Sequence, residues 1–345
     1  MSRLAADRPG FPAGRDIVVP LFRLQWSTRA VFEGLVARYG PRRLHVVAPP
    51  VVAEQLRRAA DAEGWETPAL VAHDEDVFFI GRFGLSKAEL TAVLDLEKSL
   101  YPGGWFYQQL LKLGADDGIE GLSDAFLIWD SDLLPVDAWP AVHEDGRLAY
   151  AFLQDRARGN AAIVAKWEAW IRGVLGVDPA VDEQGTFVPH HMWFVREHLV
   201  TLRRRLAEYF GDHETPWPVL MMRSANEFGT FSEFWIYASW AQARHADDAP
   251  RPYPYREYGA TTERFFEDGS APFATAARRF LAVGPDASFR PTYGDLMRFV
   301  EAEYARRSLP LPSSLSFEAS ERHRLKGRAN MHVEELRSPW HTAAD

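Results

Sequence analysis

Short apolar runs alternate with helical patterns over the first eighty residues, and this alternation limits the fold more than any other feature of the sequence. The runs have strand length, and the segments between them carry apolar residues at helical spacing. Strands are expected at residues 16–21, 44–47, 69–71 and 78–80, and helices at residues 27–39 and 51–63. Such an order predicts a parallel sheet with right-handed crossovers, and the ligands of these sheets bind outside the carboxyl ends of the strands.

A later strand leads directly into two aspartates. The apolar run at residues 126–129 is followed by Asp130 and Asp132. Side chains two residues apart in an extended segment project to the same side, so the two carboxylates are expected to converge. Two close anions repel each other unless a cation lies between them, and Mg²⁺ and Mn²⁺ prefer carboxylate oxygens together with substrate phosphates. The stretch therefore predicts a metal–diphosphate site.

The same aspartate spacing occurs again at Asp74 and Asp76, in a different context. That pair follows a short apolar run in a polar segment and is expected to form a solvated acidic turn. The spacing alone is therefore weak evidence for a metal site. The metal hypothesis depends on the position of Asp130, which follows a buried strand and two strand–helix units. The alternative is that Asp130 and Asp132 only cap the turn that follows.

Composition excludes several classes of protein. The net charge of -9 argues against a broad nucleic-acid face, and the absence of cysteine excludes disulfides, thiolate zinc sites and a cysteine nucleophile. The first residues lack the apolar core of a signal peptide, and no apolar segment reaches spanning length. These features predict a cytoplasmic protein. The expected organisation is a flexible leader at residues 1–15, one α/β domain at residues 16–245, and a helical C-terminal extension at residues 246–345 packed on the same domain.

The remaining pattern is mostly helical. Helices are expected at residues 85–100, 105–113, 160–175, 195–210, 231–244, 274–283 and 293–307, short strands at residues 148–152 and 186–188, and the first of these strands is expected to return to the sheet. Ser27 is placed to cap the first helix. The three arginines at residues 203–205 are expected on an exposed helix face.

The order of motifs resembles bacterial glycosyltransferase-like proteins of the GT-A fold, in particular a mostly uncharacterised group. The matching segments are Gly-Trp-Phe-Tyr-Gln-Gln-Leu-Leu-Lys-Leu at residues 104–113, Trp-Asp-Ser-Asp at residues 129–132 and Ser-Glu-Phe-Trp-Ile-Tyr at residues 232–237. The likeness covers about residues 15–245. It implies a GT-A-like (Rossmann-like) mixed, mainly parallel sheet flanked by helices, a nucleotide-sugar donor (UDP-linked) and Mn²⁺ or Mg²⁺.

The resemblance also implies which residues bind the donor and the metal ion. The expected donor-binding residues are Asp130, Lys112, Gln108, Gln109 and Pro20. Asp130 and Asp132 are the expected metal ligands, and His323 in the basic C-terminal cluster is the candidate for a third. Lys112 shares a helix face with Gln108 and is placed to meet a donor phosphate, the alternative being a solvated lysine at the helix end.

Glu233 is the expected catalytic residue. GT-A enzymes often carry an acidic residue at a helix start in this part of the fold, where it deprotonates the acceptor hydroxyl in an inverting reaction. The structural alternative is that Ser232 caps the helix while Glu233 favours its dipole. Glu227 is a competing carboxylate, and in a retaining reaction Glu233 would instead position the acceptor or stabilise the reacting centre.

His191 and Trp193 are expected on the acceptor side. His191, like its neighbour His190, is a candidate for binding the sugar or a metal ion, and Trp193 is a candidate for stacking on a sugar ring. The alternative is that both are ordinary core or surface residues. The expected partners are a nucleotide-sugar donor and a carbohydrate or small-molecule acceptor, with no nucleic acid and no integral membrane segment.

The leading hypothesis is therefore a metal-dependent hexosyltransferase-like enzyme that moves a sugar from a nucleotide donor to an acceptor hydroxyl. One alternative is a Mg²⁺-dependent phosphatase with an aspartyl nucleophile. Those enzymes typically follow the second aspartate with Gly-Thr, whereas Leu133 and Leu134 stand here, and they place this strand first in the fold. The other alternative is a non-catalytic protein that binds a nucleotide or carbohydrate on a transferase fold.

Overall fold

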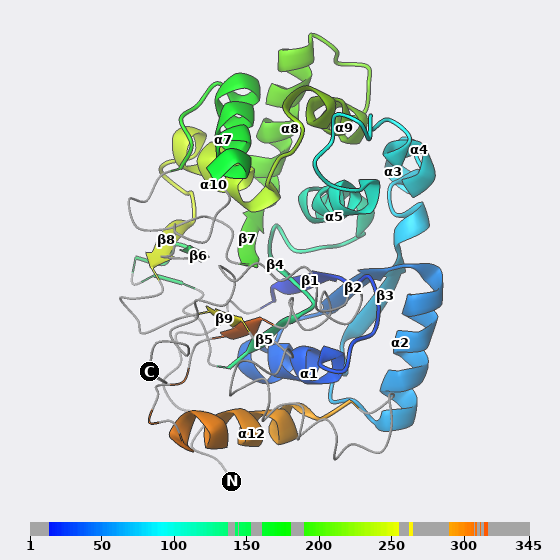
Figure 1. Ribbon diagram of the computed structural model, residues 1–345, viewed down its shortest axis with the longest axis vertical. Coiled ribbons are helices and arrows are strands. Elements are labelled where there is room, and N and C mark those ends of the chain that lie inside the picture. The colour runs from blue at the N-terminus through cyan, green and yellow to red at the C-terminus, as the bar shows by residue number, and fades with distance from the viewer. Residues whose placement is uncertain are drawn as a thin grey trace.

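The centre of the molecule is a five-stranded sheet with helices on both faces (Figure 1). The computed structural model describes residues 14–136, 142–143, 145–152, 161–180, 190–254, 262–264, 290–306, 308, 311 and 314–316. The sheet has the order β3-β2-β1-β4-β7, with β1 (Asp16–Pro20), β2 (Leu44–Ala48), β3 (Leu70–Asp74), β4 (Ala125–Trp129) and β7 (His191–Val195). β7 runs antiparallel to β4, and the other pairs are parallel. The predicted α/β class, with a mixed and mainly parallel sheet flanked by helices, is confirmed.

Two apolar cores cover the two faces of the sheet, because successive side chains of a strand point to opposite sides. Val18 and Ile128 belong to one core, and Ile17 and Leu127 belong to the other. The helices of the first core lie above the sheet in Figure 1 and are α5 (Gly103–Leu113), α8 (Arg196–Phe210), α9 (Trp217–Phe228) and α10 (Glu233–Arg244). The helices of the second core are α1 (Thr28–Tyr39), α2 (Pro50–Glu63) and α12 (Tyr293–Arg306).

Shorter elements connect these layers. The short helices are η1 (Glu75–Val77), α3 (Ile80–Phe83), α4 (Lys87–Thr91) and α6 (Ala115–Gly118), and α7 (Ala161–Trp170) continues into the π-helical η3 (Ile171–Leu175). In two small sheets, β10 (Ser314–Ser316) lies between β5 (Leu133–Pro135) and β9 (Thr262–Arg264), and β6 (Ala149–Phe152) pairs with β8 (Arg251–Pro254). The helix expected at residues 274–283 and the strand expected at residues 186–188 lie outside the described residues.

Two predictions in the segment between β3 and α5 are wrong. Residues 78 and 79 form a turn, and Ile80 begins α3. Phe78 and Phe79 are buried, and the ring of Phe79 contacts those of Tyr107 and Trp217. Residues 85–100 are helical only at α4. Beyond α4, the side chain of Asn226 bonds to the backbone of this segment. It accepts a hydrogen bond from Asp95 N at 2.8 Å and donates one to Val93 O at 2.9 Å.

The strand predicted to return to the central sheet pairs elsewhere. β6 lies parallel to β8 in a separate two-stranded sheet, and its short length suits an edge pair rather than a central strand. Helix α9 was not expected from the sequence, since Pro216 and Pro218 flank its start. Its first turn tolerates Pro218, because the first amide groups of a helix have no intrahelical acceptor.

Three side chains behave differently from their predicted roles. Ser27 precedes α1 but makes no capping hydrogen bond, and Thr28 Oγ1 instead accepts one from Gln25 N at 2.8 Å. Arg203 is not on an exposed face, because its guanidinium pairs with two aspartates of α6. Between Asp74 and Asp76, Glu75 is buried and pairs with Lys87, so this segment is not simply a solvated turn.

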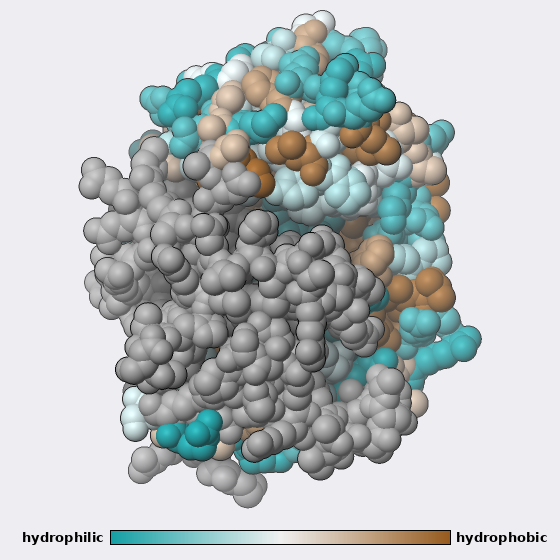
Figure 2. All heavy atoms as spheres, viewed as in Figure 1, coloured by the Kyte–Doolittle hydropathy of each residue, from teal (hydrophilic) through white to brown (hydrophobic). Residues whose placement is uncertain are grey.

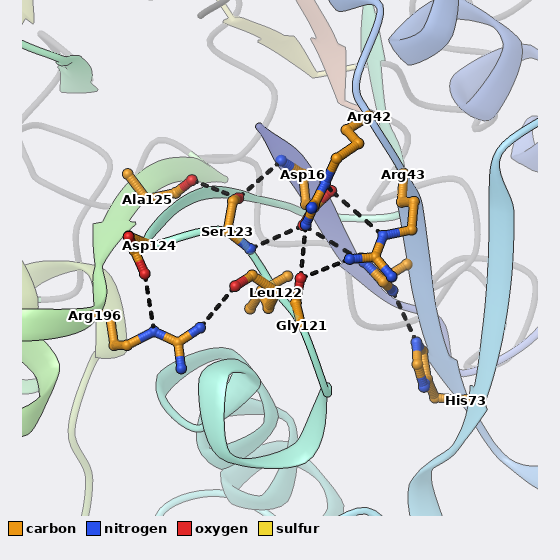
Figure 3. Close-up of polar contacts among 11 residues, drawn as sticks. Asp16, Arg42, Arg43, His73, Gly121, Leu122, Ser123, Asp124, Ala125 and Arg196 are labelled. Atoms are coloured by element: carbon orange, nitrogen blue, oxygen red, sulfur yellow. Dashed lines mark hydrogen bonds and ion pairs between the residues drawn. The ribbon is translucent and has the colours of Figure 1, made fainter. Parts of the chain in front are cut away.

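A polar network ties together the amino ends of β1, β2 and β4 (Figure 3). Asp16 is fully buried at the start of β1, where its carboxylate accepts hydrogen bonds from Arg42 Nε at 3.0 Å and from Ser123 N at 2.9 Å. Arg42 and Arg43 both donate to Gly121 O, at 2.7 and 2.6 Å. Burial favours the protonated carboxyl of Asp16, but its interactions with His45, Arg42 and Ser123 outweigh burial and hold its pKa well below the ordinary value.

Replacing Asp16 with asparagine is expected to lower the free energy of unfolding by about 1.5–3 kcal/mol at pH 7, since hydrogen bonds to a charged group are lost. Because the folded-state pKa of Asp16 is lowered, its contribution is present above the pKa of the unfolded chain and disappears in acid. Urea unfolding at pH 7 and at pH 3 should therefore show a difference that shrinks at the lower pH. Glu54→Gln, at an exposed ion pair with Arg57 and Arg58, is the control and should change stability far less.

Helix α12 is fixed onto α1 by one tyrosine. Tyr293 N donates to Glu33 Oε2 at 2.8 Å, and Tyr293 OH donates to Pro135 O at 2.9 Å. A Cβ added at Gly34 would lie 2.7 Å from the Tyr293 ring, so glycine permits this close approach. The predicted division at residue 246 stays a prediction, but α12 beyond it packs on the same side of the sheet as α1.

The described part of the surface carries apolar side chains in small groups. On the coloured part of the face in Figure 2, apolar residues form small patches among polar ones. Across the described ranges, no helix combines the length and the apolar character needed to cross a bilayer.

Candidate active site

The topology of the sheet defines one edge at which a ligand is expected. The chain lays β2 and β3 on one side of β1 and then crosses to β4 on the other side. Ligands of open α/β sheets bind where the strand order reverses, outside the carboxyl ends of the strands. Here that place lies beyond Pro20 of β1 and Trp129 of β4, and Asp130 follows immediately.

Asp130 begins a turn rather than continuing the strand. Its backbone N donates to His190 O at 2.9 Å, and its carbonyl accepts from Leu133 N at 3.1 Å. Asp132 lies within that turn, before β5. The strand alternation that was expected to align the two carboxylates therefore does not extend to Asp132, because extended structure ends at Trp129.

Lys112 joins Asp130 to Glu233. It lies near the end of α5, is only 3% exposed, and places Nζ 2.6 Å from Asp130 Oδ1 and 2.6 Å from Glu233 Oε1. The same ammonium lies 4.5 Å from the centre of the Phe234 ring. A lysine with two carboxylate partners and an aromatic face in a buried site is held in one position, so it is not a solvated helix-end lysine.

Glu233 is the first residue of α10 and is 4% exposed. Ser232 precedes it without a capping hydrogen bond from its side chain. The amide of Gln109 lies against the Glu233 carboxylate, and its nitrogen donates to Glu233 when it is oriented toward the two oxygens. The structure therefore brings Gln109 and Lys112 of α5 together with Glu233 of α10, and Lys112 also contacts Asp130, which follows β4.

His190 completes the cluster from the opposite strand. Its Nδ1 lies 3.0 Å from Asp130 Oδ2, and its φ of 64° is in the left-handed region that residues other than glycine rarely adopt. Strained backbone of this kind persists where the surroundings fix it, and it is common at functional sites. The sequence made His190, like His191, a candidate for binding the sugar or a metal ion, but no local pattern indicates its backbone conformation or its contact with Asp130.

The two carboxylates that share Lys112 have pKa values shifted in opposite directions. Burial raises the pKa of Asp130, but Lys112 and His190 outweigh burial and lower it to about 2. Burial is also the largest influence on Glu233 and raises its pKa, with Lys112 opposing and Asp130 reinforcing the rise. Burial disfavours the charged form of Lys112, but both carboxylates outweigh this and raise its pKa. Asp130 and Lys112 therefore remain charged, and Glu233 is the member that takes up a proton most readily.

The other predicted residues lie at varying distances from this cluster. Pro20 stands at the carboxyl end of β1 and is buried, and Gln108 is partly exposed on α5. His191 is 4% exposed, with its ring centre 4.6 Å from that of Trp129, and Trp193 is 2% exposed in the core beneath the sheet. The structure does not bring Trp193 to the cluster. His323 lies outside the described residues.

The expected metal pair at Asp130 and Asp132 does not fit this arrangement. Lys112 takes one oxygen of Asp130, and His190 faces the other. Within the described part of the chain, neither aspartate belongs to a group of three histidine or acidic side chains close enough to hold an ion. A metal ion at Asp130 would compete with the ammonium of Lys112 for this carboxylate, so no step of a reaction is assigned to Mn²⁺ or Mg²⁺.

Comparisons with known proteins give only distant likenesses. No protein-family model matches the chain, and no curated protein matches it. One similar solved structure is mouse xyloside xylosyltransferase 1 in its apo form, with a TM-score of 0.42, 12% identity, and coverage of 81% of this chain and 94% of that chain. Another is the apo form of glycosyltransferase GlyE from Streptococcus pneumoniae TIGR4, with a TM-score of 0.36, 10% identity, and coverage of 96% of this chain and 60% of that chain.

Proposed function

We propose that the chain is a glycosyltransferase that moves a sugar from a nucleotide donor to an acceptor hydroxyl, with Glu233 as the general base. The observation that supports this most is the pair of carboxylates on Lys112, at the edge of the sheet where the strand order reverses. Environments that push two pKa values apart assign an acid–base role to one group and a charged, structural role to the other. Glu233 takes the first role and Asp130 the second.

The charges of the cluster explain why Glu233 can accept a proton. One ammonium and two carboxylates have a net charge of about −1 when all three are ionised. Uptake of one proton by Glu233 leaves Lys112 paired with Asp130, so the protonated cluster is neutral and neither remaining charge lacks a partner. Protonation of Glu233 thus removes the net charge of the buried site and stabilises it. A general base needs such a tendency to accept a proton.

The proposed reaction is a single displacement. The acceptor oxygen loses its proton to Glu233 and forms a bond to the anomeric carbon of the donor sugar. The bond from that carbon to the diphosphate oxygen breaks, and the nucleoside diphosphate leaves with the electron pair. One displacement inverts the anomeric configuration, so a product with retained configuration would contradict this role for Glu233.

The donor is proposed to lie across the ends of β1 and β4. Pro20 and Asp130 are at the same edge, because Val18 pairs with Ile128 two residues earlier in each strand. Gln108 is a partly exposed polar residue on α5, four residues before Lys112. We propose that its side chain contacts the donor. Lys112 orients Asp130 and Glu233 instead of meeting a phosphate, and Asp132 and His323 stay predictions as metal ligands.

The phosphatase alternative is less compatible with the site. Those enzymes place the strand that precedes the nucleophile first in the fold, whereas β4 is the fourth strand along the chain. A non-catalytic nucleotide-binding protein would bind the donor at the same site without transferring the sugar. The experiment below distinguishes it from a transferase.

A thermal-shift screen of nucleoside diphosphates tests the proposal. We expect at least one of them, UDP first, to raise the melting temperature in a concentration-dependent way, since a ligand that binds only the folded chain stabilises it by mass action. No shift with any nucleotide, with or without Mn²⁺, would contradict the transferase proposal, and binding without hydrolysis or transfer of any donor sugar would favour the non-catalytic protein.

A further inference from the structure

We propose that His198, His245 and Asp248 form a metal-binding site suited to Zn²⁺, which fastens the end of α10 to the start of α8. His198 lies in the first turn of α8, His245 directly follows α10, and Asp248 lies in the next turn of the chain. One ligand atom of each residue lies within 4.8 Å of the others. Elsewhere in the ranges that the structure describes, no comparable group of three occurs.

The three side chains lie close together, and the two imidazole rings are stacked. The imidazole rings of His198 and His245 have their centres 4.1 Å apart and are inclined by 29°. His198 Nε2 lies 3.4 Å from Asp248 Oδ2. A zinc ion about 2.0–2.2 Å from each ligand atom draws such a group closer together. Asp248, with a side chain 61% exposed, and His245 at the helix end are the members able to move.

One buried nitrogen of the cluster lacks a hydrogen bond. His198 is fully buried, and its Nε2 has no hydrogen-bond partner in the structure. Buried polar atoms are nearly always bonded, so each exception needs a reason such as a bound ion. His198 Nε2 points toward Asp248, and a metal ion between them would satisfy both groups.

The other nitrogen of each imidazole is bonded to a hydroxyl group. His198 Nδ1 lies 3.1 Å from Tyr237 OH, and His245 Nε2 lies 2.7 Å from Thr201 Oγ1. Thr201 donates its single hydroxyl proton to His198 O at 3.0 Å and accepts the indole hydrogen of Trp240 at 2.9 Å. Thr201 Oγ1 is then an acceptor for His245 Nε2–H, which leaves Nδ1 of His245 as the basic nitrogen.

This arrangement matches what metal-binding histidines require. A histidine ligand normally donates its second N–H to a neighbouring oxygen, which fixes the tautomer and the ring orientation. Two imidazoles and one carboxylate are a donor set that Zn²⁺ prefers and that Mg²⁺ does not, and three protein ligands leave a fourth position for water. The site is therefore assigned to Zn²⁺.

The proposed zinc site is separate from the candidate active site. In the pairing of β4 with β7, Val195 lies opposite Ala125 and His191 lies opposite Trp129. Asp130 follows one end of this pair, and α8 with His198 follows the other, so the strand alone separates them by roughly 13 Å at about 3.3 Å per residue. Helix α10 connects them, since Glu233 begins it and His245 follows its last residue. A zinc ion would thus fix the helix that carries Glu233 from its far end.

Zinc titration of the tag-free full chain after treatment with EDTA tests this inference. We expect calorimetry to show one tightly bound Zn²⁺ per chain and the melting temperature to rise, with no such effect from Mg²⁺. Asp248→Asn and His245→Gln should abolish the tight binding, whereas Asp247→Asn, which removes the same charge one residue away, should leave it intact. Thr201→Val should weaken binding about 10–100-fold, as the loss of an outer-shell partner does.

Because His198 is fully buried and its variants risk unfolding, the exposed Asp248 decides the outcome. Equal zinc affinity in the unmodified chain and in Asp248→Asn would overturn the inference, as would the absence of any zinc-dependent rise in melting temperature. Neither readout requires activity, so the result is independent of the proposed transferase function.

Discussion

Replacing Lys112 with methionine is expected to lower the free energy of unfolding by about 3–5 kcal/mol at pH 7, since it leaves buried charges without a partner. Methionine keeps the length and apolar stem of lysine but removes the ammonium that lies 2.6 Å from both Asp130 and Glu233. Two carboxylates then face each other in a site that excludes water. Urea unfolding monitored by tryptophan fluorescence measures the loss, and nucleotide-induced stabilisation should fall with it.

The pH dependence of the Lys112→Met variant distinguishes this cause from a packing defect. Without Lys112, burial raises the pKa of both carboxyl groups in the folded chain. A raised pKa of an acid lowers stability as pH rises above its ordinary value, so the loss should be larger at pH 8 than at pH 5. A packing defect would be the same at both.

Two further variants serve as controls for Lys112→Met. Lys98→Met removes a lysine whose side chain is 64% exposed and which pairs with Asp95 at the surface, and it should change stability far less. Adding Asp130→Asn and Glu233→Gln to Lys112→Met should restore most of the lost stability, because no charge is then left unpaired. If Lys112→Met and Lys98→Met have equal effects, the buried cluster does not contribute as described.

The sheet could be predicted from sequence because its signal is local. β1, β2 and β4 are buried on both faces and therefore appear as mostly apolar runs, and α5 carries a helical apolar face. Residues 78–80 show the limit of the same signal. An apolar run also arises where a turn must bury its side chains, as Phe79 does, and local composition does not separate the two cases.

The candidate site could be predicted only in part, because its contacts join distant segments. Lys112 and Glu233 are 121 residues apart, and each was singled out by its own motif without any sign that they touch. The aspartate pair was expected to bind a cation, and Asp130 lies against the ammonium of Lys112, a contact that the sequence did not predict. The metal ion expected at Asp132 stays a prediction. His190 was a candidate beside His191, but its contact with Asp130 could not be predicted, since a left-handed residue before a strand leaves no mark in the sequence.

Replacing Glu233 with glutamine is expected to lower the rate of sugar transfer by about 10²–10⁴-fold, the usual contribution of a general base. Glutamine retains the shape of the side chain and an oxygen that can accept the hydrogen bond of Lys112 Nζ. The fold and the nucleotide-induced thermal shift should therefore persist, while kcat falls. Steady-state kinetics with saturating donor, beside the thermal shift of the same sample, separates loss of chemistry from loss of binding.

The matched control for Glu233→Gln is Glu227→Gln, which removes the competing carboxylate. Glu227 is exposed on α9 and accepts a hydrogen bond from Tyr209 OH at 2.8 Å, so its replacement should leave the rate unchanged. In the unmodified chain, kcat/KM should rise with pH through the pKa of Glu233, which burial places above its ordinary value, because only the ionised carboxylate accepts a proton. Glu233→Gln should lack this rise. An unchanged rate and pH profile in Glu233→Gln would show that the proton of the acceptor leaves by another route, and the opposed pKa shifts of Asp130 and Glu233 would then describe only how Lys112 is held.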